Sequence, residues 1–308
     1  MTATTHPIER GRNAWLAMAL TLAATGLGHI YCGRLAKGLI LFFAGFTFAP
    51  IIVLGMQEMD SGLAMAAAII SILLLVALFF YALFDAYGTA RSMDDDYRPK
   101  EYNRWYIYLM FIVVSLTYPT NLSQSIRTHL LQAFKIPTTS MAPNIRKGDY
   151  LLLNKAIYQQ QAPRRGDVVI FIPPNQRHRH YIKRVVALPG DTIAVRDQRV
   201  WINDRPLSPE NTAEQVPSPS PGGTAAHEVI EKNSERAYTI RVAPDSIQGA
   251  DFPRTRVPNG HCFVLGDNRP ASQDSRHFGP IPLADVLGRV DFVYWPAETW
   301  TRFGRFTD

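Results

Sequence analysis

The chain has 308 residues, a formal net charge of +6 and 19% charged residues, fewer than the ~25% of ordinary globular proteins. It has two cysteines and no C-x-x-C pair, which excludes a disulfide framework and a cysteine-based zinc site. Long stretches between residues 12 and 104 carry no charge, whereas almost every later stretch is charged. The sequence therefore predicts a membrane-embedded region over 1–125 and a polar domain over 126–308.

Three to four apolar segments make up the first region. The segment 62–84 has no charge and no proline, and at ~1.5 Å per residue it covers the ~30 Å hydrocarbon core of a bilayer. A buried helix of a soluble protein is the alternative, but a segment of this length without a polar face argues against it. Uncharged runs over 38–56 and 105–126 are further candidates, which predicts a multi-pass anchor.

The basic residues predict the orientation of this anchor. Lysines and arginines lie in the connections 34–37 and 88–104, whereas 57–61 has two acidic residues and no basic one. Because short cytoplasmic loops are rich in lysine and arginine, the two basic connections are expected inside and 57–61 outside. The domain beyond about residue 125 is then outside the cytoplasm.

The first apolar segment, 14–33, is ambiguous. Arg10 and Arg12 precede it and also favour the cytoplasm, which argues for a segment that does not span the bilayer. Its end, together with the next residues (26–38), resembles the glycine-rich turn of a small two-helix membrane module that is found fused to varied domains. Glycines allow two helices to pack closely, and a plain helix hairpin without a recognition role is the favoured interpretation.

From Phe134 onward, short β-rich runs recur between glycine, proline and aspartate turn signals, and no long helical period is present. This pattern predicts an all-β domain with coiled antiparallel sheets. A proline-rich segment, 206–233, is expected to be a loop or insertion, because proline cannot serve in a central strand. The expected strands are 150–153, 167–172, 181–188, 192–195, 199–202, 237–242, 261–265 and 289–295.

The histidines give no sign of a metal site. None of the eight lies in an H-E-x-x-H motif. His178 and His180 alternate as strand ligands could, but their basic neighbours would repel a cation. We expect a solvated basic edge there, with no metal, no organic cofactor and no nucleic-acid partner.

Four segments carry the chemistry. They are FKIPTTSMAPN (134–144), RGDVVIF (165–171), YIKRVVALPGD (181–191) and GDNRPASQDSR (266–276). In order and spacing they resemble the signature boxes of bacterial type I signal peptidases (leader peptidases). Four ordered boxes are far more specific than any one short motif.

The resemblance implies a role for each matched residue. Ser140 would be the nucleophile and Lys183 the general base, with the Thr138 hydroxyl and the Ser140 backbone N–H as oxyanion donors. Ser272 would orient the lysine. The implied structural charge partners are Asp274, Arg276, Asp267 and Arg184, and the implied walls of the substrate pocket are Ile136, Pro137, Met141, Ile145, Tyr181 and Ile182.

These residue types make chemical sense together. A serine hydroxyl attacks poorly until a base removes its proton, and a lysine with a pKa of ~10.4 is charged at neutral pH. Burial among apolar side chains lowers that pKa, and no acidic residue directly flanks Lys183. Departures from the family pattern are Asn144 in place of threonine, Ala187 in place of glycine, and 270–271; they concern the pocket and a local turn, not the reaction.

The sequence thus predicts a serine endopeptidase that cleaves signal peptides from exported precursors at the outer face of a bacterial cytoplasmic membrane. Its partners would be the lipid bilayer and precursors with small residues at −1 and −3. Two alternatives are a related Ser/Lys self-cleaving regulator and a non-enzymatic membrane scaffold with a peptidase-like domain. The apolar segments and the lack of DNA-binding helices oppose the first, and intact Ser140, Lys183 and Ser272 oppose the second.

Overall fold

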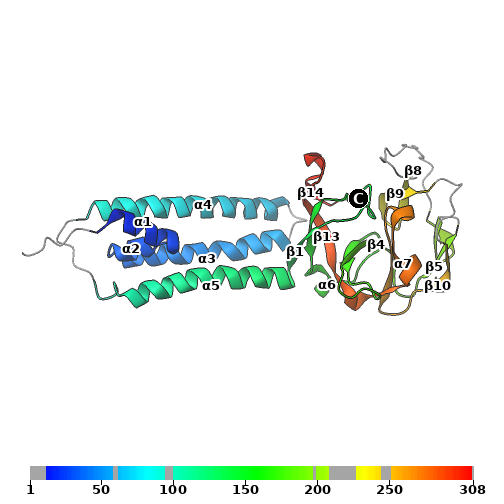
Figure 1. Ribbon diagram of the computed structural model, residues 1–308, viewed down its shortest axis with the longest axis horizontal. Helices are drawn as coiled ribbons and strands as arrows, with labels where there is room; N and C mark the ends of the chain where they lie inside the picture. Colours follow the sequence, from blue (N-terminus) through cyan, green and yellow to red (C-terminus); the bar gives the residue numbers. More distant parts are fainter. Residues whose placement is uncertain are drawn as a thin grey trace, which may run out of the picture. The chain divides into compact units, whose positions relative to one another are not determined.

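A computed structural model of the chain describes residues 12–57, 62–93, 100–196, 199–207, 227–243 and 251–306. It separates into two compact units, Met1–Arg127 and Thr128–Asp308. The first unit is helical, and the second is built mostly of strands (Figure 1). Several predicted features lie outside the described residues: Arg10, Arg98, the acidic connection over 58–61 and most of the predicted loop, 208–226.

The described residues of the first unit form five helices, the last of which runs two residues past the boundary at Arg127. They are α1 (Ala14–Ala23), α2 (Leu27–Tyr31), α3 (Leu35–Gln57), α4 (Gly62–Arg91) and α5 (Trp105–His129). Within the described ranges, one stretch, Ala66–Arg91, is long and apolar enough to cross a membrane, whereas Ala14–Ala23 and Leu35–Phe48 are shorter apolar helices. The predicted multi-pass anchor is therefore not supported, and one candidate span remains.

The ambiguous segment 14–33 does not form one long helix. Gly26 lies between α1 and α2 with a φ of +88°, a conformation that favours glycine and that breaks the helix. The turn also needs close backbone approach, because a Cβ on Gly26 would lie 2.2 Å from the carbonyl oxygen of Gly38. The glycines of 26–38 thus serve to pack the α1–α2 turn against α3.

An eight-stranded antiparallel sheet is the centre of the second unit, and its order is β1-β2-β13-β3-β4-β11-β12, with β14 paired to β13. Figure 1 labels β1, β4, β13 and β14 of this sheet. Register shifts along β13 mark bulges, which bend a sheet. The bounds are β1 (Leu131–Lys135), β2 (Tyr150–Asn154), β3 (Val168–Phe171), β4 (Tyr181–Ala187), β11 (His261–Leu265), β12 (Ile281–Pro282), β13 (Val286–Trp295) and β14 (Gly304–Arg305).

Two smaller sheets complete the unit. One has the order β10-β5-β6-β7, and the other is the β8–β9 hairpin. Their bounds are β10 (Phe252–Arg256), β5 (Thr192–Arg196), β6 (Arg199–Ile202), β7 (Arg205–Pro206), β8 (His227–Asn233) and β9 (Arg236–Val242), and two short helices are α6 (Ile157–Gln160) and α7 (Ser275–Phe278). The prediction of a mostly β domain with antiparallel sheets is confirmed. However, β8 is a strand inside the segment that the sequence predicted to be a loop up to residue 233.

Strand β4 lies where the apolar clusters of this unit meet. Ile182 packs in a cluster with Met141 and Ile145, Val185 packs with residues of β3 and β11, and Val186 packs over β5 and β6. Burying each such side chain contributes about 1.5–3 kcal/mol relative to leaving it exposed. Strand β4 is therefore held firmly on both faces.

Candidate active site

The structure brings Ser140 and Lys183 into contact. Ser140 lies in the segment that follows β1, and Lys183 lies on β4. The Lys183 Nζ donates a hydrogen bond to Ser140 Oγ at 2.7 Å and another to the Ile182 carbonyl oxygen at 2.9 Å. Both side chains are buried, with exposed fractions of 7% for Ser140 and 4% for Lys183. A buried hydroxyl and a buried amine at this distance can exchange a proton directly.

The environment of Lys183 favours its neutral form. Burial is the main cause and lowers the pKa of Lys183 from 10.5 to about 8, with Arg276 acting in the same direction. The charges of Asp274 and Asp267 oppose this shift only partly. About a tenth of the amine is therefore neutral and able to accept a proton at pH 7.

A pH profile is expected to report this lysine. Because a general base acts only when deprotonated, kcat/KM should rise with pH and level off above an apparent pKa of about 8. The measurement is the rate of precursor cleavage between about pH 6 and about pH 10, with circular dichroism as a control for unfolding. An apparent pKa near the ~10.4 of free lysine would contradict the buried environment of the base.

Two hydrogen-bond donors flank the serine hydroxyl. Thr138 Oγ1 lies 3.3 Å from Ser140 Oγ. The Ser140 backbone N–H donates to no protein acceptor in the part of the chain that the structure describes. The Thr138 hydroxyl therefore lies within hydrogen-bond reach of Ser140 Oγ, and the Ser140 N–H has no acceptor among the described residues.

Ser272 lies beside the site but does not bond to the lysine. Its side chain is buried beside the Asp274 carboxylate, and its hydroxyl helps to lower the pKa of Asp274. It packs against Gly266, where a Cβ would lie 2.2 Å from Ser272 Oγ and 2.6 Å from the Ser140 carbonyl oxygen. In this structure Lys183 is oriented by the Ile182 carbonyl instead.

Asp274 and Arg276 form a buried ion pair that joins the two ends of the segment 266–276 through the Gly266 N–H. The Arg276 Nε and Nη2 donate to the Asp274 carboxylate at 2.8 and 2.9 Å, and the Gly266 N–H donates to it at 3.0 Å. Burial raises the pKa of Asp274, but these bonds outweigh it and hold that pKa below its usual value. The carboxylate therefore stays ionised beside the site.

A second buried ion pair joins all four sequence boxes, since Arg184 Nη1 also donates to the Gly166 carbonyl oxygen at 2.8 Å. Arg184 donates to both carboxylate oxygens of Asp267 at 2.8 Å, and both side chains are 1% exposed. The Asn144 amide donates to Asp267 and to the Thr239 carbonyl oxygen, each at 2.7 Å. Asn144, noted in the sequence only as a departure from the family pattern, thus connects the serine box to this pair.

A cavity of about 630 Å³ opens onto Ser140 and Lys183. Of the predicted pocket walls, Pro137, Tyr181 and Ile182 line it. The other three are buried in the hydrophobic core instead, because the chain after β1 turns their side chains inward: Ile136, Met141 and Ile145. Thr138, which the sequence predicted as an oxyanion donor, also lines the cavity. The sequence did not identify the other lining residues, which are Phe134, Lys135, Arg179, His180, Ala271 and Gln273.

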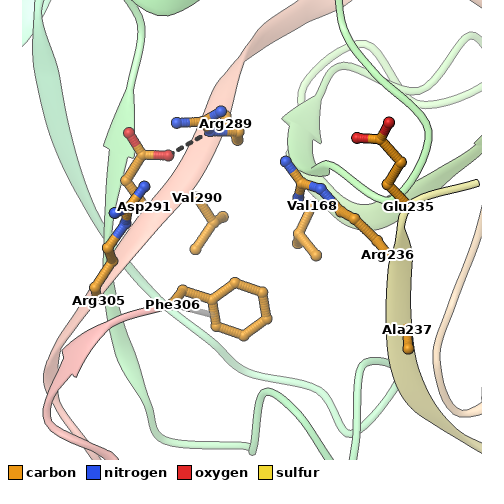
Figure 2. Close-up of a pocket in the computed structure, with 9 residues that line it drawn as sticks. All are labelled: Val168, Glu235, Arg236, Ala237, Arg289, Val290, Asp291, Arg305 and Phe306. Carbon is orange, nitrogen blue, oxygen red and sulfur yellow. Dashed lines mark hydrogen bonds and ion pairs between the residues drawn. The ribbon is translucent and has the colours of Figure 1, made fainter. Parts of the chain in front are cut away.

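A smaller cavity, of about 300 Å³, lies elsewhere in the unit and has a different character. Figure 2 shows its nine lining residues, with Arg289 bonded to Asp291 and Arg236 and Arg305 nearby. None of its lining residues is a nucleophile or belongs to the dyad. Within the described ranges, no group of three His, Cys, Asp or Glu side chains could hold a metal ion, in this cavity or elsewhere.

Comparisons with known proteins identify the family of this chain. The family model described as signal peptidase, peptidase S26, matches residues 103–295. A signal peptidase I from Pseudomonas aeruginosa is 29% identical over 233 residues, which cover 67% of this chain and 77% of the relative. One from Bacillus caldolyticus is 30% identical over 199 residues, which cover 65% and 93%.

A crystal structure of a signal peptidase I from Enterococcus faecalis is 31% identical and covers 42% of this chain and 97% of its own, with a TM-score of 0.27. The family model covers well over half of the chain and includes the serine, lysine and Gly266–Arg276 segments. The chain therefore belongs to the signal peptidase family, peptidase S26, and is a hydrolase of peptide bonds.

Proposed function

We propose that this chain cleaves signal peptides from exported precursors with Ser140 as nucleophile and Lys183 as general base. The observation that carries this proposal is the 2.7 Å hydrogen bond between two buried side chains, Lys183 Nζ and Ser140 Oγ. Neutral Lys183 removes the hydroxyl proton as Ser140 Oγ attacks the scissile carbonyl carbon. The resulting ammonium then gives this proton to the leaving amine, and an acyl-enzyme remains.

The second half of the reaction uses the same groups. Lys183, neutral again, takes a proton from a water molecule that attacks the acyl carbon, and it returns that proton to Ser140 Oγ as the ester bond breaks. In both halves the carbonyl oxygen gains negative charge. The Ser140 N–H and the Thr138 hydroxyl would stabilise that charge, because both flank Ser140 Oγ and are oriented before the reaction begins.

The cavity beside the dyad suits an extended peptide. Its walls come from the end of β1 and the start of β4, so a substrate strand between them would find backbone donors and acceptors on both sides. Tyr181, Ile182 and Pro137 provide apolar contacts for alternate side chains. Small residues at −1 and −3 are the specificity that the family resemblance implies, and we include it in the proposal.

The purified full-length protein, in detergent, is expected to cut a precursor once, after an alanine at −1 that follows an alanine at −3. Leucine at −1 should reduce kcat/KM by at least about tenfold, because extra methylene groups in a close-fitting pocket are costly. Mass spectrometry of the released chain locates the cut, and a precursor with leucine at +2 is the matched control. Equal rates with alanine and leucine at −1 would contradict this specificity.

We also propose that α4 and α5 both cross the cytoplasmic membrane, so that the catalytic unit, which follows α5, lies at the outer face. Arg91 ends α4, and Lys100 and Arg104 follow before α5, a basic cluster typical of the cytoplasmic side. The partners in this proposal are precursors with signal peptides and the lipid bilayer.

A further inference from the structure

We propose that Asn268 is a positioning residue that keeps the oxyanion hole in its working geometry by fixing the Thr139–Ser140 peptide group, an inference that rests on the proposed role of Ser140. Asn268 follows β11 and is buried, with an exposed fraction of 8%. Its side-chain amide donates to the Thr139 carbonyl oxygen at 3.1 Å, and its backbone N–H donates to the Ser140 carbonyl oxygen at 3.0 Å.

The first of these bonds determines the direction of the Ser140 N–H. The Thr139 carbonyl and the Ser140 N–H belong to one planar peptide group, in which they point in opposite directions. A donor that binds the Thr139 carbonyl oxygen therefore orients the Ser140 N–H away from that donor. Rotation of this peptide by half a turn would instead place the carbonyl oxygen where the oxyanion must form, and two negative oxygens would repel.

Asn268 shares this task with a turn in the backbone. The Ala142 N–H also donates to the Thr139 carbonyl oxygen, at 3.0 Å. Within the described residues nothing accepts from the Ser140 N–H itself, so the bonds to the Thr139 oxygen are the ones that orient this peptide. Loss of the Asn268 amide should thus weaken the orientation without removing it.

The loop that carries Asn268 is itself rigidly held. The carboxylate of its neighbour Asp267 accepts hydrogen bonds from Arg184 Nε and Nη2. The Asp267 carbonyl oxygen accepts from the Arg241 N–H at 2.8 Å. Gly266 lies so close to Ser140 that a Cβ there would lie 2.6 Å from the Ser140 carbonyl oxygen. A positioning group needs such support, because loosely held groups lose catalytic geometry.

Asn268→Ala in the full-length protein is expected to lower kcat about tenfold and to leave KM within about twofold, because the negative oxygen is absent from the bound substrate and forms only as the serine attacks. Asn268→Asp keeps the shape but replaces the N–H donor, so its loss should be at least as large. The binding of a peptide aldehyde that forms a tetrahedral adduct should weaken in proportion to kcat. The apparent pKa of the pH profile should not move in Asn268→Ala, because this change adds no charge near Lys183.

Two other variants calibrate the result. Thr138→Val deletes a proposed donor outright and should cost ~10²–10³ in kcat, more than Asn268→Ala. Asn233→Ala is the matched control: the Asn233 amide is also buried and donates to a backbone carbonyl oxygen, that of Val186, at 3.0 Å. Asn233→Ala should leave both kcat and aldehyde binding unchanged.

The proposal is overturned if Asn268→Ala keeps kcat within about twofold, if KM changes instead of kcat, or if Asn233→Ala loses as much activity. Ser140→Ala, measured in parallel, separates this failure from that of the proposed function. An inactive Ser140→Ala beside a fully active Asn268→Ala refutes only the role of Asn268, whereas an active Ser140→Ala refutes both.

Discussion

Ser140→Ala and Lys183→Met should each lower precursor cleavage by about 10³-fold or more, since groups that act as a unit fail together. Methionine keeps most of the volume of lysine and removes the amine, so the fold should survive. Lys183→Arg should be equally inactive, because a guanidinium does not lose its proton in the working pH range. Lys183→Arg thus shows whether position 183 needs a group that can accept a proton or only a positive charge.

The measurement is the initial rate of precursor cleavage by the full-length protein, with circular dichroism to confirm folding. Lys232→Met, an exposed lysine on β8, is the control and should keep normal activity. If either Ser140→Ala or Lys183→Met retains more than about a tenth of the normal rate, the dyad is not the catalytic unit.

Replacing one partner of the Arg184–Asp267 ion pair is expected to destabilise the protein by about 3–5 kcal/mol, because the other charge is left buried without compensation. Both side chains are 1% exposed, and Arg184 also lies 3.9 Å over the Tyr238 ring. Arg184→Met and Asp267→Leu together should recover part of the loss, because no lone charge then remains. Urea unfolding of the full-length protein in detergent provides the midpoint for each variant.

An exposed pair of the same chemistry is the matched control. Arg254 donates two hydrogen bonds to Asp204 at 3.1 and 2.8 Å, but these side chains are 57% and 70% exposed. Water and salt screen such a pair, so Arg254→Met should leave the urea midpoint unchanged within error. An Arg184→Met midpoint that resembles the Arg254→Met midpoint would show that the buried pair does not determine stability.

Hydrophobic runs bounded by turn signals predicted most of the large sheet. Strands β3, β4 and β11 lie within a residue or two of their expected bounds, because apolar runs between glycine or proline residues have few alternatives. Strands β1 and β8 escaped prediction because their sequences, LQAFK and HEVIEKN, mix polar and apolar residues. Their strand conformation depends on pairing with β2 and β9.

The sequence predicted the site residues that are identified by their chemistry. It did not predict those whose place depends on whether the side chain points into the cavity or into the core. The four boxes led to Ser140 and Lys183, and the structure brings these two together. Met141 was expected in the pocket, but an apolar residue suits a pocket wall and a core equally well, and only the path of the backbone separates them. The contact between Asn268 and Thr139 spans 129 positions in the sequence, and no local pattern signals it.

The pairing of strand β13 with β2 and β3 determines when, during synthesis, the enzyme can become active. Within the described sheet, β2 pairs with β1 and β13, and β3 pairs with β13 and β4. The serine follows β1 and the lysine is on β4, so these two halves of the sheet are joined through Val286–Trp295, more than a hundred residues after Lys183. During synthesis both reactive residues are made before the strand that joins them. A chain that ends before β13 therefore has the nucleophile and the base but not the assembled site, and cleavage must wait until β13 has been made.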